Sequence, residues 1–118
     1  MRFMILVKAD KTTEAGVPPT EELISAMGKL NDEMAEAGVL IAAEGLQPSS
    51  KGMRIEFSGS KRIMTDGPFT EAKELIAGFT LIRVNSREEA IEWTSRMPFA
   101  DGEVVEVRPL FEPSDFLS

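Results

Sequence analysis

The sequence predicts an α+β fold in which one antiparallel sheet carries two helices on a single face. Apolar residues alternate between strand and helix periods in the order strand, helix, strand, hairpin, strand, helix, strand. Two helices cannot cover both faces of a five- or six-stranded sheet, so one face is expected to stay open. With 118 residues, the chain has room for one domain, residues 1–118, built around one hydrophobic core.

The first strand is predicted over residues 2–8. Residues 3–7 are all apolar, so both faces of this strand are hydrophobic, which is typical of a strand inside a sheet. A polar connector follows at residues 10–19 and ends with Pro18 and Pro19. Because proline lacks a backbone donor and interrupts regular structure, we expect neither strand nor helix in this connector.

The first helix is predicted over residues 21–37. Thr20 is a suitable N-cap, and the carboxylates of Glu21 and Glu22 suit the positive end of a helix. Gly38 is placed to end it. The apolar stripe expected to face the core consists of Leu23, Met27, Leu30, Met34 and Ala37.

The middle of the chain predicts a strand, a loop and a hairpin. The segments are a strand at 39–44, a loop at 47–52 and hairpin arms at 53–57 and 61–65. The sequence Ser58-Gly59-Ser60 joins the two alternating arms, which is typical of a tight hairpin. Residues 66–69 should break the second arm because they contain Gly67 and Pro68. Residues 70–74 are expected to form one helical turn.

The last third of the chain predicts another strand, helix and strand. Ser86 and Glu89 have the spacing of a capping box, and Pro98 is placed to end the helix. The segments are a strand at 77–84, a helix at 87–96, a strand at 104–110 and a tail at 112–118 that crosses to a neighbour or frays. The element order therefore points to a ferredoxin-like sandwich.

The open face of this sandwich carries apolar residues, because Met4 and Leu6 lie opposite Phe3, Ile5 and Val7 on the first strand. A large apolar surface on a soluble chain usually marks an association site. We therefore expect a homodimer in which two sheets pack open face to open face.

Charge and composition exclude several classes of function. Thirteen basic and 20 acidic residues give a net charge of −7, which disfavours nucleic acid and anionic membranes as partners. The chain has no cysteine and no histidine, so zinc fingers, thiol nucleophiles and Ser-His devices are excluded, and no cofactor is predicted. The apolar run at residues 3–7 is too short for a signal peptide or a membrane span, so we expect a cytoplasmic protein.

The run from Thr65 to Glu74, TDGPFTEAKE, resembles the motif of the DGPF-domain branch of the YCII-related superfamily. Weaker matches are MRFMILV at residues 1–7, AEGLQP at 43–48 and VEVRP at 105–109. The resemblance implies a ferredoxin-like unit that dimerises through its sheets into a dimeric α/β barrel. It implies no defined reaction, because this fold hosts enzymes of several kinds and non-catalytic proteins.

Some YCII-type proteins pair a histidine with an aspartate that precedes a proline-aromatic step near the end of the second helix. Here that step is Met97-Pro98-Phe99, so methionine stands in place of the acid. Asp101 is close in sequence but out of register. The catalytic pair is therefore absent from this chain.

Asp66 is the candidate catalytic residue. A carboxylate at a strand end, held by a Gly-Pro turn beside a cleft, is suited to act as a general base or to bind a cation. The alternative is a structural role, in which the carboxylate accepts hydrogen bonds from the backbone amides that follow it.

The candidate substrate-binding residues are ionisable side chains placed near the mouth of the barrel. Such a group can orient a small acid or polarise a carbonyl, although a charged run is more often a solvated face or an intersubunit salt bridge. Glu44 and Asp66 could hold a divalent cation, but no calcium loop is present and no metal is predicted. The candidates are Glu44, Arg62, Glu71, Lys73 and Glu74.

Two functions are compatible with these residues. The first is binding of a small acidic or aromatic metabolite in the cleft of a dimeric barrel, with acid–base catalysis through Asp66 and its charged neighbours. The alternative is a non-catalytic accessory or regulatory module that binds a protein partner. The two differ in the cleft, since ligand binding needs an apolar cavity with a few convergent polar groups.

Overall fold

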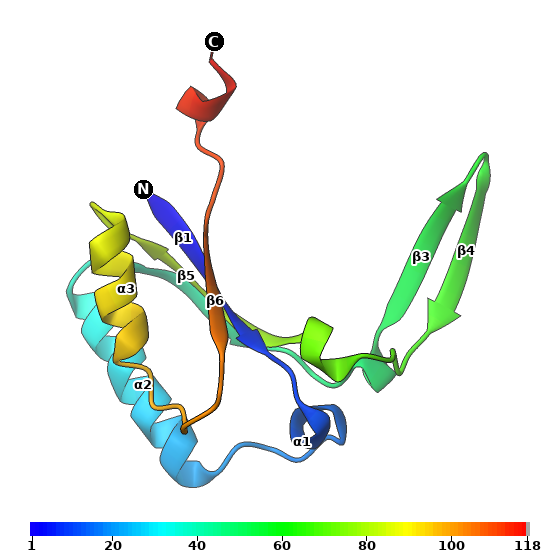
Figure 1. Cartoon of the computed structure of the whole chain (residues 1–118), viewed down its shortest axis with the longest axis horizontal. Coiled ribbons are helices and arrows are strands. Elements are labelled where there is room, and N and C mark those ends of the chain that lie inside the picture. Colours follow the sequence, from blue (N-terminus) through cyan, green and yellow to red (C-terminus); the bar gives the residue numbers. More distant parts are fainter. Residues whose placement is uncertain (118) are drawn as a thin grey trace.

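A computed structural model describes residues 1–117, apart from the side chain of Lys73. Its centre is a four-stranded antiparallel sheet with the strand order β2-β5-β1-β6. The two long helices lie together on one side of this sheet (Figure 1). The strands are β1 (Arg2–Lys8), β2 (Leu40–Gly45), β5 (Ile76–Arg83) and β6 (Val105–Pro109), and the helices are α2 (Glu21–Glu36) and α3 (Arg87–Ser95). The expected α+β, ferredoxin-like fold is confirmed.

Strand β1 is central, as its two apolar faces predict. Ile5 lies opposite Thr80 of β5 on one side and opposite Val107 of β6 on the other. Ile5 is completely buried, because α2 and α3 cover this face of the sheet. An antiparallel pairing on each side satisfies the backbone groups of the strand.

Both helices begin at the residues that the sequence predicts. The hydroxyl of Thr20 accepts a hydrogen bond from the amide of Leu23 at 3.1 Å, and Gly38, with φ +73°, follows the end of α2. The hydroxyl of Ser86 caps α3 through the amide of Glu89 at 3.1 Å. The predicted capping box is only half formed, because the Glu89 carboxylate accepts from the Asn85 amide instead of the Ser86 amide.

The hydrophobic core lies between the sheet and the two helices. Met34, Ile5 and Ile82 are its largest fully buried side chains. The methionines on the predicted helix stripes fill the core as expected, with Met27 and Trp93 packed at its margin. The other buried members are Phe3, Leu30, Val39, Val84, Ala90 and Met97.

The connector after β1 corrects one expectation. A short helix, α1 (Lys11–Glu14), forms where we expected no helix. Asp10 accepts a hydrogen bond from the Thr13 amide at 2.8 Å, and the Thr13 hydroxyl accepts one from the Asp10 amide at 2.8 Å. This reciprocal cap satisfies backbone amides at the start of the helix, so a single helical turn forms before the proline-rich sequence. The expected turn at 70–74 is a 3₁₀ turn over Ala72–Glu74.

The hairpin corrects a second expectation. Strands β3 (Met53–Ser58) and β4 (Lys61–Asp66) form a separate two-stranded sheet and do not join the central one. The hairpin projects away from the rest of the chain (Figure 1), and all its residues are exposed. The radius of gyration is 16.5 Å, compared with roughly 13 to 14 Å for a compact chain of this length. The hairpin is therefore an exposed arm that no other strand joins in the described part of the chain.

The face of the central sheet opposite the helices is apolar at its centre and charged at its edges. Met4, Leu6, Phe79 and Leu81 point away from the helices and are half-buried in the single chain. Charged residues of β1 and β6 border them, and the Lys8 ammonium lies 3.8 Å from the Glu106 carboxylate. No helix in the described part of the chain has the length and apolar character needed to cross a bilayer.

Candidate functional site

A cavity of about 910 Å³ lies at one end of the central sheet. The ends of β1 and β2 and the beginnings of β5 and β6 border it, together with α1 and the first turn of α2. Most of its wall is apolar. Its apolar side chains include those of Val7, Leu23, Leu46, Phe99 and Val104.

Backbone hydrogen bonds fix the segments around this cavity. The Ala9 amide donates to the Leu75 carbonyl at 2.9 Å, and the Leu46 amide donates to the Ala77 carbonyl at 2.8 Å. These bonds extend the pairing of β1 with β5 and of β2 with β5 beyond the regular strands. The wall on this side is consequently preformed, which reduces the ordering that a ligand must impose.

The polar groups of the cavity are few and lie on its border. The Lys8 ammonium is close to Glu106, and the Asp10 carboxylate caps α1 through the Thr13 amide. The border also includes Glu103, whose amide donates to the Ala100 carbonyl at 3.1 Å and whose carboxylate has no recorded hydrogen bond or ion pair in the described structure. Threonine hydroxyls at positions 12 and 20 add polar atoms that can donate or accept.

A smaller hollow of about 470 Å³ adjoins the cavity, because Ala9 and Asp10 line both. Glu71 lines this second hollow and is the one candidate residue with a described side chain that does so. Its backbone has φ 62° and ψ 59°, a left-handed conformation that side-chain-bearing residues seldom adopt. Such strain is retained only where the surrounding structure imposes it.

Asp66 ends β4 at the base of the hairpin, and its side chain is exposed. The turn role proposed for it is not seen, since the amides that follow bond elsewhere. The Gly67 amide donates to the Gly52 carbonyl at 3.0 Å, and the Phe69 amide donates to the Ser49 hydroxyl at 2.9 Å. Asp66 does not line either hollow.

The residues after Asp66 anchor the hairpin to the loop at 49–52. A Cβ atom on Gly67 would lie 1.8 Å from the Ser49 carbonyl oxygen, so glycine is needed at this close approach. Ser49 also donates its amide to Glu14 at 2.9 Å and its hydroxyl to the same carboxylate. The Arg54 guanidinium lies 3.9 Å from the centroid of the Phe69 ring.

Sequence reasoning missed Glu14 and Ser49 as partners of this motif. They lie 35 residues apart, and nothing in their local sequence indicates the contact. Gly67 was the available indication, because a glycine before a proline marks a backbone with special demands. The need for glycine at position 67 follows from the loop at 49–52, which packs against it in the tertiary structure.

The remaining candidates are spread over the chain. Arg62 lies near the hairpin tip, donating to the Gly59 and Lys61 carbonyls at 3.2 and 2.9 Å. Glu44 is exposed on β2, opposite Phe79 on the open face of the sheet. Glu74 is exposed in the 3₁₀ turn, and the Lys73 side chain lies outside the described structure. A single chain therefore does not bring these residues to one place.

No group of three or more acidic side chains placed to hold a metal ion occurs in the part of the chain that the structure describes. Oxygen ligands for a hard cation must converge from several side chains, and Glu44 and Asp66 lie on different sheets. Glu44 and Asp66 of one chain therefore do not form a metal site together.

The chain matches the YCII-related domain over residues 1–114. It belongs to the YCII-related family. An uncharacterized protein of Rhizobium meliloti (strain 1021) is 30% identical over 102 residues, which cover 83% of this chain and 82% of that protein. A solved structure with 13% identity and a TM-score of 0.49 covers 98% of both chains. It is 5-chloro-2-hydroxyhydroquinone dehydrochlorinase (TftG) from Burkholderia phenoliruptrix AC1100, in complex with 2,5-dihydroxybenzoquinone.

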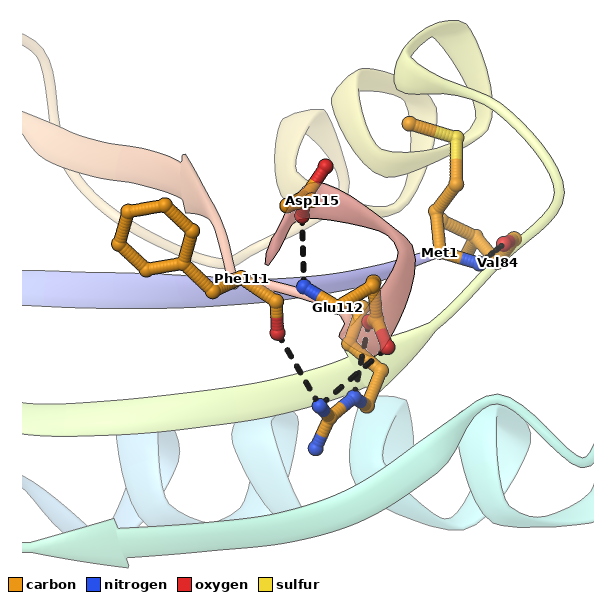
Figure 2. A network of polar contacts seen from close by, with 6 residues as sticks. Met1, Val84, Phe111, Glu112 and Asp115 are labelled. Atoms are coloured by element: carbon orange, nitrogen blue, oxygen red, sulfur yellow. Dashed lines mark hydrogen bonds and ion pairs between the residues drawn. The ribbon is translucent and has the colours of Figure 1, made fainter. Parts of the chain in front are cut away.

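A polar network in this YCII-related protein holds the C-terminal segment beside β1 (Figure 2). The Arg2 guanidinium donates to the Glu112 carboxylate at 2.9 Å and to the Phe111 carbonyl at 3.4 Å. The hydrogen bond from Arg2 holds the pKa of Glu112 below its usual value of 4.5, and the charge of the pair acts in the same direction. The Glu112 amide in turn donates to Asp115 at 2.6 Å.

Proposed function

We propose that this YCII-related protein binds a small, mainly apolar organic metabolite in the cavity at the end of the sheet. The observation that supports this is the cavity of about 910 Å³ with an apolar wall and polar groups at its border. Ligand pockets are generally a few hundred to ~1,000 Å³, lined by apolar side chains with a small number of polar groups that orient the ligand.

The charges around the cavity favour an uncharged ligand. Among the described side chains that line it, Asp10 and Glu103 contribute two carboxylates, against the single ammonium of Lys8, which is already close to Glu106. A carboxylate or phosphate on the ligand would meet this excess of negative charge in a chain whose net charge is −7. Threonine hydroxyls suit a hydroxyl or carbonyl group on the ligand instead. An aromatic or aliphatic molecule with one or two such groups fits best.

The proposal concerns ligand binding. Acid–base catalysis through Asp66 would in addition require Asp66 to lie beside the bound ligand. Asp66 and Arg62 do not line the cavity of their own chain. Glu71 borders the adjoining hollow and is the candidate placed to meet a ligand there. A catalytic role for Asp66 requires that a second copy of the chain complete the site.

We also infer that two copies pair through the open face of the central sheet. Support comes from Met4, Leu6, Phe79 and Leu81, which form an apolar centre bordered by charged residues. This is the arrangement of association surfaces, which have an apolar centre and a polar rim. Light scattering should give the mass of two chains, and Leu6→Glu should reduce it to one by placing a charge at the centre.

A thermal-shift screen of uncharged aromatic and aliphatic metabolites tests ligand binding. A ligand at a hundred times its Kd stabilises the folded form by about 2.7 kcal/mol, or a Tm increase of roughly 10 °C for a domain of this size. Leu23→Trp should fill the cavity and abolish the shift. Ile24→Trp is the matched control, because Ile24 is the next residue of α2 and is 56% exposed.

Val104→Trp gives a second cavity-filling variant, since Val104 lines the cavity and is 66% exposed. Because Val104 is exposed, this variant should fold like the wild type, and circular dichroism checks the fold of all three variants. If the compound that stabilises the wild type stabilises both cavity-filling variants equally, the cavity is not the binding site. If a diverse library produces no shift in the wild type, the proposal fails.

The alternative, a non-catalytic module that binds a protein partner, is favoured by one observation. The hairpin exposes large apolar side chains, including Ile55 at 51% and Phe57 at 74%. Exposed apolar surface of this kind is usually covered in the functional assembly. A wild-type protein without any metabolite shift would leave this second function as the better one.

A further inference from the structure

The hairpin has one predominantly apolar face. Residues opposite each other in an antiparallel pair point to the same side, and here Ile55 lies opposite Met64 and Phe57 opposite Arg62. Met53 shares this side, since it alternates with the same period, and so does Asp66, which lies opposite Met53 at the base of the hairpin. We call Met53, Ile55, Phe57 and Met64 the arm face. Their side chains are 52%, 51%, 74% and 62% exposed.

Exposure of the arm face to water is unfavourable in free energy. A two-stranded hairpin is at best marginally stable on its own and needs packing against another element. Burying a large apolar side chain is worth roughly 1.5 to 3 kcal/mol, and the arm face has four of them exposed in the single chain. The hairpin is therefore expected to pack on a surface that its own chain does not provide.

A second exposed apolar surface lies in residues 111–117, which we call the C-terminal segment. Phe111, Phe116 and Leu117 are 74%, 72% and 78% exposed, and the two phenylalanine rings lie 5.1 Å apart. The segment is held in place by Arg2 through Glu112 (Figure 2). In the described structure it forms a 3₁₀ turn over Pro113–Phe116 and presents an apolar surface, so the expectation of a tail that crosses to a neighbour or frays stays a prediction.

The two surfaces have opposite charge. Residues 53–66 contain three basic and two acidic residues, so the hairpin is positive in a chain whose net charge is −7. The C-terminal segment contains Glu112 and Asp115 and no basic residue. Two hairpins in contact would bring two elements of net positive charge together, and like charges disfavour this. A hairpin in contact with the C-terminal segment joins opposite charges and two apolar surfaces.

We propose that the arm face of one copy packs on the C-terminal segment of a second copy. This rests on the pairing through the open sheet face proposed above. In Figure 1 the hairpin and the C-terminal segment extend from the sheet at separate places. A two-fold axis parallel to the paired faces can bring a projection at one side of a copy against the other side of its partner. The contact is then made twice, once by each hairpin.

The contact has a consequence for the ionisable candidates. It carries Arg62, which lies opposite Phe57 on the arm face, toward Glu112 and Asp115 of the second copy. The Arg62 guanidinium already lies 4.4 Å from the centroid of the Phe57 ring, so it is held on the arm face. Arg62 thus acts between copies, which explains why one chain does not bring it near Glu44.

Cysteine crosslinking tests this contact without background, because the chain has no cysteine. Phe57→Cys and Phe116→Cys are made separately, the second with a tag that changes its size, and the two are co-expressed. A short bismaleimide should yield a covalent product of one tagged and one untagged chain. Both positions are highly exposed, so the variants should fold, which circular dichroism checks.

Glu22→Cys is the matched control for Phe116→Cys. Glu22 is exposed in the first turn of α2, on the helix-covered side of the sheet. Co-expression of Phe57→Cys with Glu22→Cys should give at least tenfold less mixed product. Phe57→Cys alone should give no covalent dimer.

Three results would overturn the proposal, and they differ from one another. A covalent dimer of Phe57→Cys alone would mean that hairpins contact hairpins. No mixed product in a sample that light scattering shows to be paired would leave the pairing intact and reject the arm contact. A single-chain mass would reject both. Ligand binding is read separately by the thermal-shift screen, so its failure is not confused with any of these.

Discussion

Replacing Gly67 by alanine tests whether the DGPF stretch anchors the hairpin as the structure indicates. A Cβ atom at this position would lie 1.8 Å from the Ser49 carbonyl oxygen and 2.6 Å from the Ser49 carbonyl carbon. Both are backbone atoms, so no side-chain rotation can relieve the overlap. The loop at 49–52 and the base of the hairpin must move apart.

The expected size of the effect follows from the hydrogen bonds that this movement breaks. They are the bond from the Gly67 amide to the Gly52 carbonyl at 3.0 Å and the bond from the Phe69 amide to the Ser49 hydroxyl at 2.9 Å. Each is worth a net ~1 kcal/mol, so Gly67→Ala should lower the free energy of unfolding by about 2 kcal/mol. For a domain of this size, that corresponds to a Tm lower by roughly 8 °C.

Calorimetry measures the loss, and Gly28→Ala is the matched control. Gly28 lies inside α2, and a Cβ atom there would meet nothing within 4 Å. The same substitution should therefore stabilise the protein by up to ~1 kcal/mol, the difference in helix propensity between glycine and alanine. The same glycine-to-alanine substitution should therefore lower the free energy of unfolding at position 67 and raise it at position 28.

Amide hydrogen exchange locates the change within the chain. The Gly67 and Phe69 amides should lose protection in Gly67→Ala, whereas amides of the central sheet should keep theirs. Wild-type melting together with unchanged protection at both amides would refute the close approach to Ser49. Lost protection at an unchanged Tm would show that the hairpin base opens independently and that the estimated magnitude is wrong.

Three further predictions concern single side chains. Ser86→Ala should destabilise the protein by ~1 kcal/mol in denaturant titration, because the Glu89 amide loses its cap; no loss would contradict the start of α3. Arg2 keeps the pKa of Glu112 below 4.5, so the ion pair contributes stability above that pH and loses it as the pH falls through the lowered pKa. Wild type should therefore be more stable than Glu112→Gln near neutral pH and equal to it in acid, and a difference that grows in acid would show the wrong sign. Asp66→Asn should change stability by no more than ~0.5 kcal/mol, because the amides of the turn bond elsewhere; a large fall in Tm would restore the turn role.

Local sequence predicted the elements well where short-range hydrogen bonding decides them. Thr20 and Gly38 delimit α2 because a cap and a left-handed glycine act within a few residues. The hairpin followed from alternation and a central Gly59. The cap that Asp10 provides for α1 is also a short-range signal. The sequence analysis missed it because the prolines that follow indicated a segment without a helix.

The candidate site was predicted less well, because its residues were chosen by chemistry and closeness in sequence. Glu71 reached a hollow, whereas Arg62 lies at the tip of an arm. The cavity is instead built from strand ends and from the connector before α2, whose residues carry no catalytic pattern. Apolar lining residues such as Leu23 resemble ordinary core residues in a sequence.

The amino-acid sequence by itself determined the order of the strands and of the two long helices, the first residue of each of these helices, and hence the ferredoxin-like class, because each depends on periodicity and capping within a few residues. Only the tertiary structure decided that the hairpin leaves the central sheet, that Gly67 meets Ser49, and that Glu112 returns to Arg2. These contacts join residues far apart in the chain. Their free energy depends on which surfaces the whole fold brings together, and no local pattern encodes that choice.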